Sequence, residues 1–343
     1  MIFPEGSMTS LKAVGETAYD VVIVGSGVSG AIIAQQLSQA GKRVLILEAG
    51  PGEDATLSGY ENYLQRFYGA NIKDNQAPYP RNRNAAMPRS PDLKKLAEGE
   101  TDTSTYIVQQ GPFVTDSVYT RVLGGTTMHW EAKVPRFLPE DFEMKSQFEK
   151  AVDWPVGYDE LESYYRIAER EFGVSGDVEE QKRIGVKFPP DYVYPMHKMP
   201  HSYLDQKVNE GLQGTGVELD GKQYELCIRS FPQARNGIPN PAYDGGKGFR
   251  PVGAISTHQV DAGERCQGNN NCVPLCPVQA KYHAGKTLSK ALQTGRVDIL
   301  TQAVASRIHI DPDNGRVTRI EFKHYKDPDS GDHESASVSA KLF

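Results

Sequence analysis

Three of the four cysteines stand close together in the segment RCQGNNNCVPLCPVQAKY, residues 265–282. Cys266, Cys272 and Cys276 are separated by five and three residues, and Pro277 follows the last of them. Thiolates on a short loop can surround a compact inorganic cluster, and a proline often follows the final cysteine in iron–sulfur proteins. The segment lacks the paired C-x-x-C or C-x-x-H spacing of common zinc sites. Three ligands without an evident fourth favour a 3Fe–4S cluster, with zinc or a disulfide as the alternatives.

The fourth cysteine stands apart from this group. Cys227 lies upstream in the segment YELCIRSF, and its apolar neighbours predict a buried structural thiol, not a metal ligand. With the other three cysteines gathered in one short segment, a general disulfide framework is not expected.

A glycine-rich turn near the N-terminus has the spacing of a dinucleotide site. The apolar run DVVIVG predicts a buried parallel strand, and Gly25, Gly27 and Gly30 follow in the pattern G-x-G-x-x-G. The segment AIIAQQLSQAG then predicts a helix, and RVLILEAG predicts a second buried strand that ends at Glu48. The order strand, turn, helix, strand with an acidic residue at this distance predicts dinucleotide binding.

Each of these residues has a physical task in such a site. Gly25 permits the tight turn, Gly27 lets the backbone approach a pyrophosphate, and Gly30 lets the helix and strand pack closely. The helix N-terminus offers free N–H groups and the positive end of its dipole to the phosphates. Glu48 is placed to accept hydrogen bonds from ribose hydroxyls. The ending EAGPG, which includes Gly50, resembles FAD proteins more than NAD proteins.

The segment RVLGGTTMHWEAKVPRFLPEDF, residues 121–142, contains two adjacent glycines and two threonines, so its backbone can lie against a flat ring. It resembles the flavin-contact loop of the glucose–methanol–choline oxidoreductase family, and GGTTMHW resembles the sugar dehydrogenase branch and the pyranose oxidases. The resemblance implies flavin contacts from Arg121, Gly124, Gly125, Thr126 and Thr127. In some relatives the histidine of this loop is covalently joined to the flavin, and His129 occupies that position. The alternative is a core histidine beside Trp130.

The cysteine segment resembles the cluster loop of FAD-dependent sugar and polyol dehydrogenases, the catalytic subunits that act on glucose, fructose, sorbitol or gluconate. A relative that has lost the cluster is a further alternative to zinc and a disulfide. The upstream segment FPQARNG, residues 231–237, matches that branch too. The resemblance implies oxidation of a sugar or polyol hydroxyl by hydride transfer to FAD, with electrons leaving through a 3Fe–4S cluster to a haem subunit or another acceptor. The alternatives are an enzyme like pyranose oxidase or glucoside 3-dehydrogenase, and a non-catalytic flavin electron carrier.

The resemblance also implies further parts that are expected to lie at or beyond the end of this sequence. Members of the family continue past residues such as these with a strand that returns to the dinucleotide sheet, and then with a substrate domain that carries a His–His or His–Asn pair. None of the eight histidines matches that pair, and the sequence ends in SAKLF, where the returning strand is expected to begin. We therefore expect no catalytic residue in this chain and a C-terminal substrate domain that is largely absent.

Charge and the N-terminal segment bear on partners and location. The net charge of −6 disfavours nucleic acid, which attracts basic surfaces. The N-terminal segment has neither the apolar run of a signal peptide nor a twin arginine, so no export signal is expected in this chain. Because relatives in the resembled branch work outside the cytoplasm, we expect a periplasmic or membrane-associated location, reached through a small companion subunit with a twin-arginine leader. A multihaem cytochrome c subunit is the expected electron acceptor.

The expected fold class is α/β, an FAD-binding Rossmann-like three-layer fold with an added antiparallel meander and loop-rich insertions. Four segments are expected: a dinucleotide-binding core at 15–55, a loop-rich flavin-contact and cap region at 56–180, the cluster loop and continuation of the FAD domain at 181–295, and the meander at 296–343. Helices are predicted within 155–174 and 282–295. Residues 55–115 lack strong periodicity and are expected to be loop-rich. By resemblance to flavoproteins of this type, backbone near Val304 is expected to contact adenine.

Overall fold

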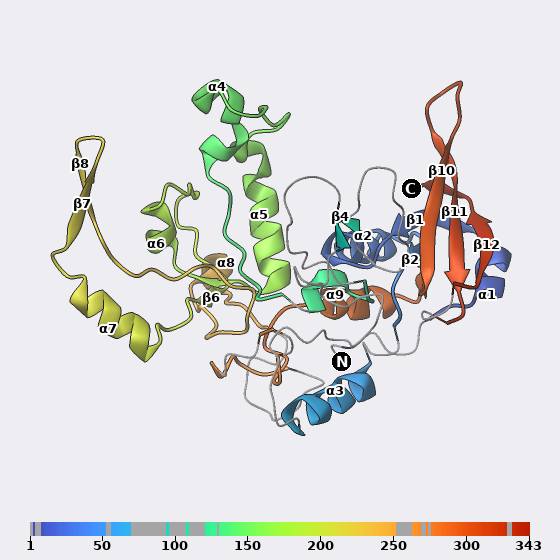
Figure 1. Cartoon of the computed structure of the whole chain (residues 1–343), viewed down its shortest axis with the longest axis horizontal. Coiled ribbons are helices and arrows are strands. Elements are labelled where there is room, and N and C mark those ends of the chain that lie inside the picture. The colour runs from blue at the N-terminus through green and yellow to red at the C-terminus, as the bar shows by residue number, and fades with distance from the viewer. Residues whose placement is uncertain are drawn as a thin grey trace. The chain divides into compact units, whose positions relative to one another are not determined.

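The computed structural model describes residues 3, 8–52, 56–69, 94–95, 108–109, 121–128, 130–251, 263–268, 272–273, 276–327 and 331–343. Its contacts divide the chain into two compact units, and Figure 1 labels most of their helices and strands. Unit 1 comprises Met1–Glu131, Asn269–Pro277 and His283–Phe343. Unit 2 comprises Ala132–Gly268 and Val278–Tyr282.

A four-stranded parallel sheet lies at the centre of unit 1. In sheet order its strands are β13 (Ala340–Leu342), β1 (Tyr19–Val24), β2 (Val44–Leu47) and β9 (Val297–Leu300). All four residues of β2 are buried, as expected for an inner strand whose two faces are both covered. The two apolar runs on either side of the glycine-rich turn are therefore strands, as their sequences predict.

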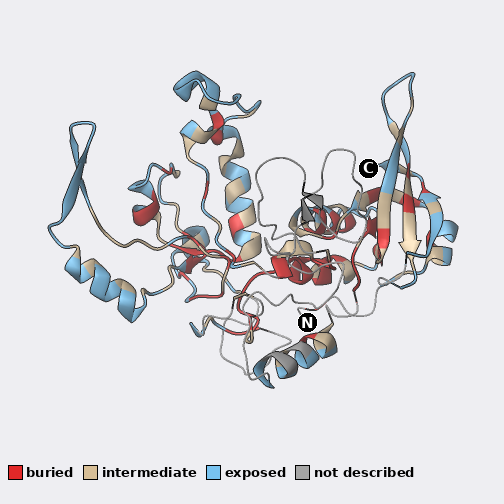
Figure 2. Ribbon diagram, viewed as in Figure 1, coloured by how far each residue is buried: buried red, intermediate tan, exposed pale blue. Residues whose placement is uncertain are grey.

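Two further layers cover this sheet. Helix α2 (Val28–Gln39) packs on one face, where Ile23 of β1 points, and α9 (Ala284–Leu292) packs beside α2. Seven of the nine residues of α9 are buried, which Figure 2 shows in red. On the other face, Val22 and Leu45 pack against Phe322 of the antiparallel meander. The meander consists of β10 (Ala303–Ile310), β11 (Val317–Tyr325) and β12 (His333–Val338). The predicted three-layer α/β class is confirmed.

The structure corrects two sequence-based expectations in unit 1. Residues 297–300 are not part of the meander but form β9, which pairs in parallel with β2, because its apolar residues are buried in the central sheet. Within the region expected to be loop-rich, residues Leu57–Gly69 form helix α3. The strand expected to return to the dinucleotide sheet is present as β13, which pairs in parallel with β1. Most of the remaining residues between 55 and 115 lie outside the described part of the chain.

Unit 2 is built from short elements joined by long connections. Its elements are η5 (Pro139–Phe142), α4 (Met144–Phe148), α5 (Tyr158–Phe172), β5 (Ser175–Gly176), α6 (Val178–Lys182), β6 (Met196–His197), α7 (Tyr203–Gly211), β7 (Gly216–Leu219), β8 (Lys222–Glu225) and α8 (Tyr243–Gly246). Helix α5 lies within the predicted segment 155–174. It begins after Gly157, whose N–H donates to the Glu160 carboxylate at 2.8 Å, and ends at Gly173 in the left-handed conformation.

The remaining described elements of unit 1 are α1 (Leu11–Glu16), β3 (Lys94–Lys95), β4 (Val108–Gln109) and the short helix η4 (Gly125–Met128). None of the helices in the described part of the chain combines the length and apolar character that a membrane-spanning segment requires.

Candidate dinucleotide-binding site

The glycine-rich turn links the end of β1 to the start of α2. The N–H of Gly25 donates to the carbonyl of Leu47 in β2 at 2.8 Å, and Gly25 has a φ of +91°, which favours glycine. A Cβ at Gly30 would lie 2.1 Å from the Gly25 carbonyl oxygen. The first glycine is therefore favoured by the backbone conformation of the turn, and the third is required by the packing of helix against strand.

The middle of the turn is open. Gly27 is the N-cap of α2, where no side chain caps the helix. A Cβ built at Gly25 or at Gly27 would meet no atom within 4 Å. The free N–H groups at the start of the 12-residue helix thus adjoin open space at the positive end of its dipole. This arrangement fits the pyrophosphate of a dinucleotide.

Glu48 is a buried carboxylate next to this turn. Its Oε2 accepts hydrogen bonds from the N–H of Ser26 at 2.9 Å and the hydroxyl of Ser26 at 2.5 Å, and its Oε1 accepts from the N–H of Gly50 at 2.7 Å. Burial raises the pKa of Glu48, and these hydrogen bonds and the charge of Arg121 oppose that rise. The carboxylate is therefore held in one orientation by the turn and by the residues that follow β2.

Ser26 joins this turn to the predicted flavin-contact loop. Its hydroxyl, which donates to Glu48, also accepts from the N–H of Gly124 at 2.9 Å, and Ser26 is fully buried. Ser26 was not among the residues predicted from the sequence. The available signal was its position between Gly25 and Gly27, where a small side chain can reach the acid that follows the second strand.

Glycines let the loop approach the turn closely. A Cβ at Gly50 would lie 2.2 Å from the Arg121 carbonyl oxygen, and a Cβ at Gly125 would lie 3.3 Å from the Cα of Gly27. The N–H of Leu123 donates to the Pro51 carbonyl at 3.0 Å. The structure thus brings together three predicted segments that are far apart in the sequence, the turn, the region after β2 and the loop.

Thr127 connects the C-terminal end of this loop to α9 by hydrogen bonds. Its hydroxyl donates to the Gly124 carbonyl at 2.6 Å and accepts from the N–H of Ala284, at the start of α9, at 2.9 Å. Thr126 lies beside it in η4 and is partly exposed. His129 lies outside the described residues, so its predicted flavin contact stays a prediction.

Val304 lies in β10, next to the predicted ribose-binding acid. The N–H of Ala303 donates to the Glu48 carbonyl at 2.8 Å, which brings the start of β10 to the end of β2. Val304 is partly exposed. Its predicted adenine contact stays a prediction.

All four cysteines are among the described residues, and none forms a disulfide. Cys266 and Cys272 are partly exposed and Cys276 is buried, with its carbonyl accepting from the hydroxyl of Tyr60 at 2.7 Å. Within the described ranges, no three His, Cys, Asp or Glu side chains form a group that could hold a metal ion. Cys227 is partly exposed, so the prediction that it is a buried thiol was wrong.

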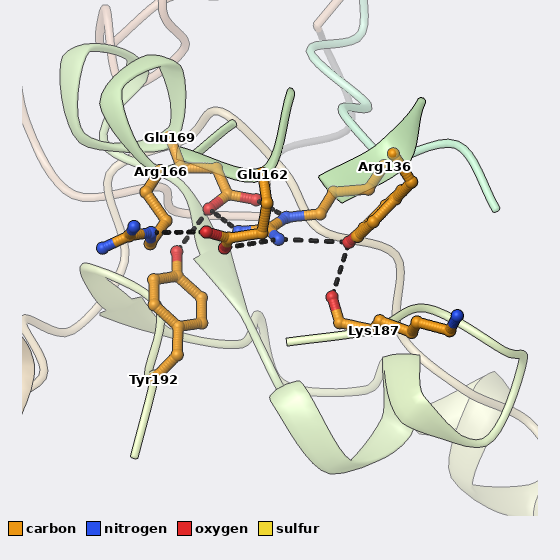
Figure 3. Close-up of polar contacts among 7 residues, drawn as sticks. Arg136, Glu162, Arg166, Glu169, Lys187 and Tyr192 are labelled. Carbon is orange, nitrogen blue, oxygen red and sulfur yellow. Dashed lines mark hydrogen bonds and ion pairs between the residues drawn. The ribbon is translucent and has the colours of Figure 1, made fainter. Parts of the chain in front are cut away.

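Unit 2 contains a second buried charged group, around Arg136 (Figure 3). Its guanidinium forms a bidentate pair with Glu169, at 2.7 and 2.8 Å, and a further contact with Glu162 at 3.2 Å. The hydroxyl of Tyr192 also donates to Glu169, and the ring of Phe188 lies 4.6 Å from the guanidinium carbon. Because Glu162 and Glu169 belong to α5 and the other partners precede or follow it, this Arg136 cluster holds α5 to its neighbouring segments.

Comparisons with known proteins agree with the dinucleotide site. Residues 23–56 match the family model of the NAD(P)-binding Rossmann-like domain. The chain is 33% identical to the fructose dehydrogenase large subunit of Gluconobacter japonicus over 327 residues, 94% of this chain and 51% of that protein. It is thus matched over almost its whole length and spans about half of that relative.

Two shorter matches cover 46% of this chain and 25% of each relative. One is the 2-methyl-1,2-propanediol dehydrogenase of Mycolicibacterium austroafricanum, 31% identical over 161 residues. The other is the gluconate 2-dehydrogenase flavoprotein of Pantoea cypripedii, 27% identical over 169 residues.

Proposed function

Because this chain belongs to the glucose–methanol–choline type of FAD-dependent oxidoreductases, we propose that it binds FAD and forms the flavin-binding part of a sugar or polyol dehydrogenase. The observation that carries the proposal is the 33% identity to the fructose dehydrogenase large subunit over 94% of the chain. The open turn at Gly25 and Gly27 and the buried carboxylate of Glu48 support it, since a dinucleotide requires both features.

FAD, when bound, supplies a flavin ring that accepts a hydride from the carbon bearing the substrate hydroxyl. The residues of this chain bind and orient it. The N–H groups at the start of α2, which adjoin open space beside Gly27, would bind the pyrophosphate. Glu48, already oriented by Ser26 and Gly50, accepts hydrogen bonds from the ribose hydroxyls. The predicted flavin-contact loop, which Thr127 connects to α9 by hydrogen bonds, would position the flavin ring.

We also propose that Cys266, Cys272 and Cys276 bind a 3Fe–4S cluster, which when bound carries electrons one at a time towards a haem subunit or another acceptor. The proposal rests on the spacing of the thiols, on Pro277 and on the resemblance to the cluster loop of sugar dehydrogenases. Since the described residues contain no assembled metal-binding group, this proposal depends on the chemistry of the three thiols and on direct measurement of iron.

The assembly proposed for this protein follows from the name of one relative, and the proposed location follows from the family resemblance of its sequence. The name of the Gluconobacter japonicus protein identifies it as a large subunit, so it works with at least one other chain. We infer that the present protein likewise works with a companion subunit, which carries the twin-arginine leader, and that it acts in the periplasm or at the membrane.

The activity is tested by supplying the purified protein, together with any segment that follows residue 343, with fructose, gluconate, glucose or sorbitol and an artificial dye as the electron acceptor. Dye reduction with one of these sugars, without oxygen, is the expected result. Hydrogen peroxide formed from oxygen without any dye would favour the oxidase alternative. Bound flavin without oxidation of any sugar would favour a non-catalytic electron carrier.

Glu48→Ala is expected to lose FAD, because the ribose hydroxyls lose a charged hydrogen-bond acceptor. A hydrogen bond to a charged group contributes about 1.5–3 kcal/mol, so the affinity should fall tenfold or more. Flavin absorbance per protein after dialysis measures the loss. The matched control is Glu16→Ala, at an exposed position in α1, which should retain FAD. Wild-type protein that binds NADP and shows no flavin absorbance would refute the FAD assignment.

Cys272→Ser is expected to lose iron and acid-labile sulfide and to keep FAD, because two thiolates cannot hold a core that needs three. Wild-type protein should contain about three irons per flavin and give an electron spin signal when oxidised. The control Cys227→Ser should leave the iron content unchanged. Zinc in place of iron, or wild-type protein without any metal, would contradict the cluster.

A further inference from the structure

Residues 202–226 of unit 2 form an arm without a core of its own. The arm consists of α7 and the hairpin β7–β8, and all of its residues are described. None of them is buried, as the pale blue of these elements in Figure 2 shows. An isolated two-stranded hairpin is at best marginally stable in water, and so is an isolated helix of nine residues.

The hairpin has one apolar face. Val217 pairs with Tyr224 across the strands, and Leu219 pairs with Lys222. Directly opposite residues, and residues two apart along a strand, point to the same side. One face of the hairpin therefore carries Val217, Leu219 and Tyr224, with Lys222 at its end beside the turn. Leu219 is 59% exposed and Tyr224 is 48% exposed. Glu218, Gln223 and Glu225 occupy the opposite face.

Helix α7 adds exposed apolar side chains to the arm. Leu204 and Val208 are four residues apart, on one side of the helix, and Tyr203 is 75% exposed. The side-chain carbonyl of Asn209 in α7 accepts from the N–H of Ile228 at 2.8 Å, which joins the helix to the chain that follows the hairpin. The arm therefore presents apolar side chains from two elements that are held together at its base. Exposed apolar surface of this kind marks interaction sites.

The charge of the arm distinguishes between the partners that could bind it. It contains five acidic and two basic residues, a net charge of −3. A second copy of this chain, with its net charge of −6, would bring like charges together. An anionic membrane surface would repel the arm for the same reason. A protein surface with an apolar groove bordered by Lys and Arg satisfies both the apolar face and the acidic residues around it.

We propose that the acidic arm, residues 202–226, docks the chain onto a non-identical protein subunit through Val217, Leu219 and Tyr224, with basic residues of that subunit around the groove. This inference rests on the proposed function, in which the chain works as one subunit of a dehydrogenase. It names the surface and the chemistry of the partner, which the relatives' names do not.

Site-specific crosslinking in the full-length protein, expressed in its own cells, tests the docking surface. A photoreactive benzophenone amino acid replaces Leu219 on the apolar face or, as the matched control, Glu218 on the opposite face. Both positions are exposed, so neither replacement should disturb folding. The probe at 219 is expected to crosslink, at least fivefold more than the probe at 218, to a chain of different sequence, at a site flanked by Lys and Arg. Raising the salt from 0.1 to 1 M before irradiation should lower the yield, because the Debye length falls from about 10 Å to about 3 Å.

Several results would contradict the proposal that the arm is a docking surface. They are a crosslink from position 219 to a second copy of the chain, a crosslink to another segment of the same chain, equal yields at the two positions, or no crosslink at all. FAD content and sugar-dependent dye reduction are measured on the same preparations. If FAD content and dye reduction match those of the wild type but the expected crosslink does not form, only the proposed docking surface is refuted. Protein without FAD would refute the proposed function itself.

Discussion

Gly30→Ala is expected to destabilise unit 1 by about 3 kcal/mol or more, as overpacking against rigid backbone does in its severe cases. The new Cβ would lie 2.1 Å from the Gly25 carbonyl oxygen, and neither atom belongs to a flexible side chain. Gly50→Ala should act similarly, because its Cβ would lie 2.2 Å from the Arg121 carbonyl oxygen. Denaturant unfolding of the purified variants measures both effects.

Two glycine variants serve as controls for this result. Gly15→Ala lies in α1, where a Cβ meets nothing within 4 Å, and it should leave stability unchanged or raise it by up to about 1 kcal/mol. Gly27→Ala also meets no protein atom, so it should fold normally, yet its Cβ would enter the space proposed for the pyrophosphate. We expect this variant to keep wild-type stability and lose FAD. Wild-type FAD content in Gly27→Ala would contradict the proposed position of the pyrophosphate.

Arg136→Met is expected to destabilise unit 2 by about 3–5 kcal/mol, because it leaves the buried carboxylate of Glu169 without its partner. The double variant Arg136→Met with Glu169→Leu should recover much of the loss, since it removes both charges together. Chemical unfolding followed by fluorescence measures the difference. A single variant as stable as the wild type would show that the Arg136 cluster does not support the unit.

A surface ion pair provides the control for the Arg136 cluster. Lys182 pairs with Glu179 at 2.8 Å, with 47% and 76% of the two side chains exposed, so Lys182→Met should cost at most about 1 kcal/mol. Burial alone would lower the pKa of Arg136, but hydrogen bonds to Glu169 and its charge raise that pKa above the ordinary value. A group whose pKa is raised by folding stabilises the protein fully at every pH below its unfolded pKa. Because both pH 6 and pH 8 lie below the pKa of an unfolded arginine, the guanidinium should contribute equally to the free energy of unfolding at these two pH values.

The glycine-rich turn could be predicted because its constraints are local. The turn, helix α2 and the first two strands depend on apolar runs, glycine spacing and an acid at a fixed distance, all within one stretch of chain. Helix α5 was predictable for the same reason, since its apolar spacing and its glycine end lie within the helix itself. The hairpin β7–β8 also has a local signal, the Asp-Gly pair at its turn. Asp220 and Gly221 both have positive φ between paired strands, as a two-residue turn requires.

The cysteine group illustrates where a sequence pattern predicts chemistry without placing it. The spacing of Cys266, Cys272 and Cys276 limits which metal centres they could hold. Whether the three thiols come close together depends on the path of the backbone, which no local sequence pattern determines. The prediction for Cys227 failed for a related reason, because apolar neighbours in sequence do not decide how much of a side chain the rest of the fold covers.

The sequence by itself determined the dinucleotide-binding turn, the acid beside it and the α/β class, because each follows from residues close together in the chain. Only the tertiary structure decided that β9 joins the parallel sheet, since strand partners are chosen by long-range burial and not by local propensity. It alone revealed Ser26 as the link between Glu48 and Gly124, three residues from three separate segments. It likewise paired Arg136 with Glu169 from another element, because a buried charge must find its partner wherever the fold brings one.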